Sequence, residues 1–118
     1  LVFLRPLGLR LGSESIVLHG PNVETVFSVS LPVGMLPDIK VQGQAKRLDD
    51  GDIIIMMSDG ISEAGFGTVR TDWLKKEIKM PFDTMDEMAQ SVIENAVKKS
   101  RDAVIDDMTV ATIRLIRN

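Results

Sequence analysis

The chain has 118 residues, of which 44% are hydrophobic, so it is long enough for one domain with a buried core and is not a disordered segment. Its formal net charge of −3 and the absence of a dense Lys/Arg run argue against a nucleic-acid partner. There is no cysteine, which excludes disulfides and thiolate metal sites and fits a reducing, cytoplasmic compartment. No apolar run approaches the ~20 residues of a membrane-spanning helix, so we expect no membrane contact from these residues. Because the first residue is Leu1 rather than Met, we expect a longer parent protein, and any membrane anchor would lie outside this chain.

The first third of the chain has the pattern of a β-hairpin followed by an ordered turn. Residues 15–19 and 23–29 predict two strands, the second with apolar residues alternating on one face, around a turn at residues 20–22. Prolines and a glycine punctuate residues 31–37, which predicts a turn or crossover.

The middle of the chain predicts two more strands. Residues 41–48 form the first, and the Asp-Gly turn at residues 49–52 predicts a hairpin, because glycine adopts positive φ without penalty. Residues 53–57 are continuously apolar, which is typical of a strand buried on both faces. This strand ends at Asp59, an unusual position for a charge.

Two amphipathic helices and a closing strand follow. The first helix begins near residue 72 and runs to about residue 78, and the second has apolar residues at helical spacing over residues 85–97, with Asp83 or Thr84 as its cap. Alternation over residues 108–116 predicts the last strand. The sequence therefore predicts an α+β fold of antiparallel β-sheet with flanking helices.

Acidic residues occur at the ends of two apolar strands. Asp59 follows one strand, and Asp106 and Asp107 precede another. If these strands are antiparallel neighbours, the three carboxylates converge at one edge, where a hard cation such as Mg²⁺ or Mn²⁺ would relieve their repulsion. The alternative is a plain turn and a solvated loop; the acidic turn at residues 49–52 is fully explained as a hairpin.

The sequence motifs in these segments resemble those of a known enzyme family. RLDDGDIIIMMSDGISEA (residues 47–64) is similar to the strand-turn-strand of the PPM metal-dependent protein phosphatases, and IDDMTVATIRL (residues 105–115) to that family's closing strand. LPVG (residues 31–34) resembles the family's Pro-x-Gly turn, and GSESIVL (residues 12–18) an earlier strand. Within the family, the stage II sporulation protein E branch is the most similar. The resemblance implies that residues 1–118 are one domain, the C-terminal portion of an α-β-β-α sandwich that is incomplete here.

The resemblance also assigns roles to residues. It implies that Asp59 and Asp106 are metal ligands, that Asp107 hydrogen-bonds around the site where many members carry Asn, and that Ser58 and Gly60 shape the turn. The implied centre holds two Mn²⁺ or Mg²⁺ ions and needs no catalytic side chain. The implied activity is hydrolysis of phosphoserine or phosphothreonine on a protein, and the branch points to a phosphorylated anti-anti-sigma factor in sporulation sigma-factor activation.

One departure from the family limits this expectation. The family's earlier Asp-Gly-x-Gly motif is absent, so two carboxylates alone cannot build a two-metal centre, and we expect the isolated fragment to be inactive. A non-catalytic interaction module is the alternative function, and a homodimer stays open.

For His19, the only histidine, we expect a surface or hydrogen-bonding role, and for Trp73 we expect a helix anchor to the core. Residues 1–11 and 61–84 have no predicted role.

Overall fold

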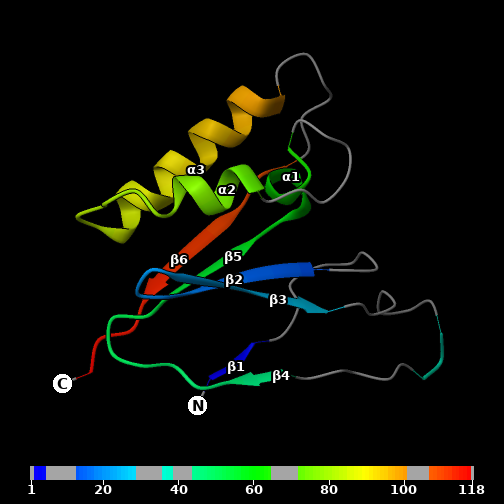
Figure 1. Ribbon diagram of the computed structural model, residues 1–118. Coiled ribbons are helices and arrows are strands. Elements are labelled where there is room, and N and C mark those ends of the chain that lie inside the picture. Colours follow the sequence, from blue (N-terminus) through cyan, green and yellow to red (C-terminus); the bar gives the residue numbers. More distant parts are fainter. Residues whose placement is uncertain are drawn as a thin grey trace.

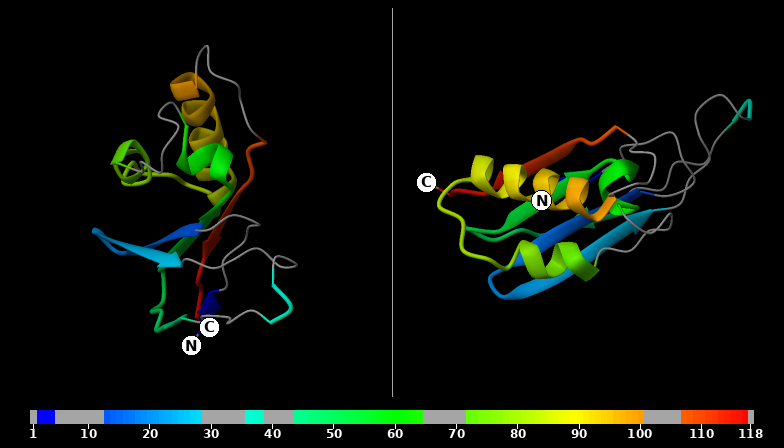
Figure 2. Two further views of the ribbon diagram at one scale, coloured as in Figure 1. Left: turned by 90° about the vertical axis from the view of Figure 1, so that its right-hand side faces the viewer. Right: turned by 90° about the horizontal axis from the view of Figure 1, so that it is seen from above.

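The structure, a computed structural model, describes residues 2–4, 13–28, 36–38, 44–64, 72–100 and 107–117. Its helices cover one face of a four-stranded antiparallel sheet, and a two-stranded sheet lies on the other side (Figure 1). The side view in Figure 2 shows the same order of layers. The predicted α+β class is therefore confirmed. None of the described helices is long and apolar enough to cross a membrane.

The larger sheet has the strand order β3-β2-β5-β6, and every neighbouring pair is antiparallel. Its strands are β2 (Ser13–His19), β3 (Asn22–Ser28), β5 (Ile53–Met57) and β6 (Val110–Arg114). β5 is central and lies between β2 and β6, so both of its hydrogen-bonding edges are occupied. Its side chains alternate between the apolar clusters on the two faces of the sheet, which explains why its sequence is apolar throughout.

The β2–β3 hairpin is confirmed, with a tighter turn than predicted. His19 pairs with Asn22, which leaves only Gly20 and Pro21 between the strands. Gly20 has a φ of +55°, a left-handed conformation that glycine adopts without strain. The remaining predicted residue of this hairpin, Val29, lies outside the described residues, as does most of the predicted turn at residues 31–37.

The predicted hairpin between residues 41–48 and β5 is wrong. In the described part of that segment only β4 (Gln44–Lys46) is a strand, and it pairs with β1 (Val2–Leu4) in the smaller sheet. The Asp-Gly turn does form, since Asp52 N–H donates to the Asp49 carbonyl at 3.1 Å and Gly51 has a φ of +85°. The turn joins two different sheets, because β5 has no free edge to offer β4.

In the described part of the chain, three helices pack on the larger sheet: α1 (Asp59–Ser62), α2 (Asp72–Glu77) and α3 (Met85–Ser100). The predicted cap of α3 is confirmed at Thr84, whose Oγ1 accepts the Glu87 N–H at 3.2 Å. The short helix α1 was not predicted. Four residues are too few to show a helical period in the sequence.

Apolar residues fill both faces of the larger sheet. One cluster lies between the sheet and the helices, with Trp73 packed against it as predicted. The other lies on the opposite face, where Leu48, in the segment after β4, covers Val17, Val26 and Ile54. The helix-side cluster consists of Ile16, Leu18, Ile55, Met57, Ile61, Ala64, Leu74, Ile78, Met88, Val92 and Ala96.

Candidate metal-binding edge

The two acidic strand ends lie at the same edge of the sheet. β5 and β6 are antiparallel neighbours, and Met57, the last residue of β5, pairs with Val110, the first residue of β6. Asp59 therefore follows one strand where Asp107 precedes the other. The strands are therefore antiparallel neighbours, which is the condition under which the carboxylates are expected to converge.

Ser58 ties the two strand ends together. Its backbone N–H donates to the Thr109 carbonyl at 2.9 Å, and its Oγ accepts the Thr109 N–H at 2.9 Å. The same hydroxyl donates to the Asp107 carbonyl at 3.1 Å. Because the Ser58 hydroxyl is engaged both as donor and as acceptor, it fixes the backbone of the edge. The resemblance implies a turn-shaping role for this residue, and that role stays a prediction.

Asp59 is the first residue of α1, directly where the chain leaves the central strand. Ser58 is still extended, with φ −82° and ψ 166°, and its carbonyl accepts N–H groups from Ile61 at 3.0 Å and Ser62 at 3.3 Å. Gly60 is buried, and Ile61 is fully buried in the core beneath the helix. The half-buried Asp59 is thus held by a rigid strand on one side and an anchored helical turn on the other.

Asp107 and Asp106 stand differently in the structure. Asp107 is exposed, and its backbone carbonyl is the acceptor for Ser58. Asp106 lies outside the described residues, so its distance from Asp59 stays a prediction. The described edge offers the side chains of Ser58, Asp59 and Asp107, and their only possible metal-ligating atoms are oxygens. This donor set fits Mg²⁺ or Mn²⁺, which prefer carboxylate and other oxygen ligands.

The opposite end of the sheet holds a cluster that the sequence did not reveal. His19 Nδ1 lies 2.6 Å from Asp52 Oδ2, and Asp52 is only 4% exposed. The hydrogen-bonding role predicted for His19 is confirmed. The interpretation of Asp52 as a plain hairpin residue is incomplete, because its carboxylate is buried against a side chain 33 positions away. No local pattern could have revealed this pair.

Comparisons with known proteins show the family of the chain. The sequence profile of the family described as stage II sporulation protein E (SpoIIE) matches residues 9–116. The chain is 32% identical over 113 residues to stage II sporulation protein E of Bacillus subtilis (strain 168); the match covers 93% of this chain but only 14% of the relative.

Solved structures show the same likeness. The PP2C phosphatase domain of SpoIIE from Bacillus subtilis, solved with a fragment of its regulatory domain, matches with a TM-score of 0.77 and 30% identity, over 90% of this chain and 33% of that chain. A manganese-presoaked structure of the SpoIIE phosphatase domain from Bacillus subtilis matches with a TM-score of 0.69 and 27% identity, over 99% of this chain and 57% of that one.

Proposed function

The chain belongs to the stage II sporulation protein E family and has the fold of part of a PPM-type phosphatase domain, and on that premise we propose that it forms the C-terminal portion of a catalytic domain that dephosphorylates serine or threonine on a protein. The chain spans 14% of the length of its Bacillus subtilis relative, so this activity is proposed for the whole protein. The 118-residue chain by itself lacks the upstream acidic motif and is inactive in this proposal.

The observation that carries the proposal is the set of three hydrogen bonds made by Ser58 to Asp107 and Thr109, which we call the Ser58 clamp. Its three hydrogen bonds hold the start of β6 against the turn that presents Asp59. A solvated loop and a plain turn, the alternative for these acidic residues, would not need such a connection. The clamp supports a shared edge at which Asp59 and Asp106 act together.

The proposed reaction is an in-line displacement at phosphorus. A water oxygen attacks the phosphorus atom, the P–O bond to the serine or threonine breaks, and the alcohol oxygen receives a proton as phosphate leaves. Asp59 and Asp106 would hold Mn²⁺ or Mg²⁺, which when bound lowers the pKa of water and offsets negative charge on the phosphoryl oxygens. Asp107 would hydrogen-bond around these ligands, and Ser58 and Gly60 would hold the turn that positions Asp59.

The proposed substrate is a phosphorylated anti-anti-sigma factor, and the proposed setting is cytoplasmic control of a sporulation sigma factor. This proposal follows from the resemblance to the sporulation branch. No nucleic acid enters it, since the chain carries a net charge of −3.

The test is the substitution Asp59→Asn in the full-length protein. Loss of a direct ligand should lower Mn²⁺-dependent dephosphorylation of a phosphoserine-containing anti-anti-sigma factor by more than ~100-fold, since changes around metal ligands already cost ~10–100-fold. Asp50→Asn is the matched control, because it removes one exposed carboxylate at the opposite end of the sheet and should leave the activity unchanged.

Two outcomes would count against the proposal. Full activity of the Asp59→Asn protein would refute the ligand assignment. A wild-type protein that binds the phosphoprotein without releasing phosphate would favour the alternative, a non-catalytic interaction module.

A further inference from the structure

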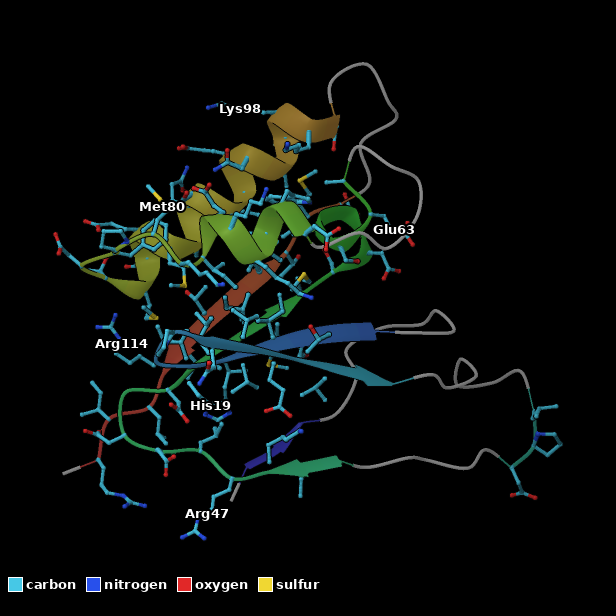
Figure 3. The ribbon with its side chains drawn as sticks, viewed as in Figure 1. His19, Arg47, Glu63, Met80, Lys98 and Arg114 are labelled. Atoms are coloured by element: carbon cyan, nitrogen blue, oxygen red, sulfur yellow. The ribbon has the colours of Figure 1, made fainter. Side chains whose placement is uncertain are left out.

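Three metal-ligand side chains meet at the end of the sheet that lies opposite Ser58. His19 ends β2, and Asp49 and Asp52 belong to the turn that leads into β5; each offers one ligand atom, and these atoms lie within 4.8 Å of one another. The five residues of β5, at ~3.4 Å each, separate this cluster from Asp59 by about 17 Å. In Figure 3 His19 lies toward the Arg114 end of the sheet, and Glu63, just after α1, lies at the other end.

Asp52 is the fixed centre of the cluster. It is 4% exposed, and its Oδ2 accepts the Asp49 backbone N–H at 2.8 Å while lying 2.6 Å from His19 Nδ1. The backbone bond holds Asp49 next to the same carboxylate, and its exposed side chain can turn toward it. Two carboxylates and one imidazole nitrogen thus offer ligand atoms within 4.8 Å of one another.

The other ring nitrogen of His19 is also engaged. Nε2 lies 3.4 Å from Glu24 Oε2, and Glu24 contacts Lys46, whose hydrogen bond lowers the pKa of the Glu24 carboxyl. Glu24 is therefore an ionised acceptor for a proton on Nε2, and Nδ1 faces the two aspartates. This is the arrangement found around metal-bound histidines, which usually donate their second ring N–H to a carboxylate or carbonyl.

We propose that His19 Nδ1, Asp49 and Asp52 form a Zn²⁺ site with water as the fourth ligand. A mixed set of one imidazole and two carboxylates suits Zn²⁺, with bonds of about 2.0–2.2 Å in a tetrahedron. In the bound state Nδ1 offers its lone pair to the metal while Nε2 keeps the proton that faces Glu24, and a proton that lies between Nδ1 and Asp52 Oδ2 in the metal-free chain is released to solvent. The ion links the β2–β3 turn to the connection between the two sheets, and this site stands independently of the proposed phosphatase function.

The test uses the fact that His19 is the only histidine in a chain without cysteine. Any Zn²⁺ that is bound by an imidazole in this chain must be bound by His19, so imidazole ¹⁵N NMR during a Zn²⁺ titration reports this site alone. The titration is run on the 118-residue chain in an Asp59→Asn background, so that Asp59 contributes nothing. We expect the Nδ1 resonance to change with saturation at one equivalent, and the midpoint of thermal unfolding to rise, because Zn²⁺ binds the folded state.

Asp49→Asn is the decisive variant, because its backbone N–H and the His19–Asp52 bond remain. It should weaken Zn²⁺ binding by more than ~10-fold. Asp50→Asn, which changes the neighbouring carboxylate that accepts the Arg117 N–H at 2.7 Å, should bind like its parent. An unchanged Nδ1 resonance at millimolar Zn²⁺ would show that the cluster is only a hydrogen-bonded His–Asp pair. Equal Zn²⁺ affinity with Asp49→Asn would show that Asp49 is not a ligand and would likewise overturn the three-residue site.

Discussion

Asp106 and Asp107 are adjacent carboxylates with different expected roles. If the strand pattern of β6 (Val110–Arg114) extends back to these two residues, their side chains point to opposite faces, and only one of the two can be directed at a metal shared with Asp59. Asp107 is exposed, and its backbone carbonyl is held by Ser58. The resemblance assigns the direct ligand to Asp106 and only hydrogen bonding to Asp107.

This distinction predicts unequal effects in the full-length protein. Asp106→Asn removes a ligand charge and should abolish most activity, whereas Asp107→Asn keeps a hydrogen-bonding group and should cost no more than ~10–100-fold. A Mn²⁺ titration with a phosphoserine-protein assay on both variants measures the difference. Equal losses would mean that both carboxylates ligate, and the reverse order would mean that the register is shifted by one residue.

The hydrogen-bond partner of a residue can be predicted from the sequence when that partner is close by in the chain. Thr84 was predicted as a helix cap because the residue it caps is three positions away, and the structure confirms the bond. His19 was predicted to hydrogen-bond, yet its partner Asp52 could not be identified from spacing. Long-range pairing of polar side chains depends on the register of the sheet, which cannot be predicted from a single sequence.

At the level of elements, β5 and α3 were predictable and β4 was not. A continuous apolar run and a helical period are intrinsic to a segment, whereas the partner of a short strand depends on which sheet edges remain free. β2 and β6 occupy both edges of β5, so β4 pairs with β1 instead. The same Asp-Gly turn is compatible with either outcome.

The junction between β5 and β6 yields a prediction for two matched substitutions. Ser58→Ala removes two hydrogen bonds at an exposed strand end, and Thr84→Ala removes the cap of α3; each should lower the free energy of unfolding by about 1 kcal/mol. Only Ser58→Ala should also reduce activity of the full-length protein, because it alone loosens the edge that carries Asp59. Urea denaturation of the chain and phosphatase assays of the full-length protein measure the two effects.

Comparing the two variants separates a local effect on the edge from a general loss of stability. If Ser58→Ala and Thr84→Ala destabilise alike and both retain activity, the Ser58 clamp is structural only. If both lose activity in proportion to stability, the loss reflects unfolding and says nothing about the edge.

At the level of the whole molecule, the two faces of the larger sheet are covered unequally. The helices bury one face, but on the other Ile113 remains 46% exposed although its strand neighbour Ile54 is buried. Ile116, just beyond β6, is 73% exposed. In the sandwich that the resemblance implies, a second sheet packs on this face, and the chain covers only 57% of the manganese-presoaked structure of the SpoIIE phosphatase domain. The overall layers could be predicted from the sequence, but the extent of the second sheet could not.

The central claim is that Asp59 and Asp106 share a metal ion at one edge of the sheet. Anomalous diffraction from crystals of the full-length protein soaked in Mn²⁺ tests it most directly. The account predicts manganese bonded to a carboxylate oxygen of each residue, with the two carboxyl groups roughly 6 Å or less apart, as oxygen ligation requires. Manganese bound elsewhere, with neither the Asp59 nor the Asp106 carboxylate among its ligands, would contradict it.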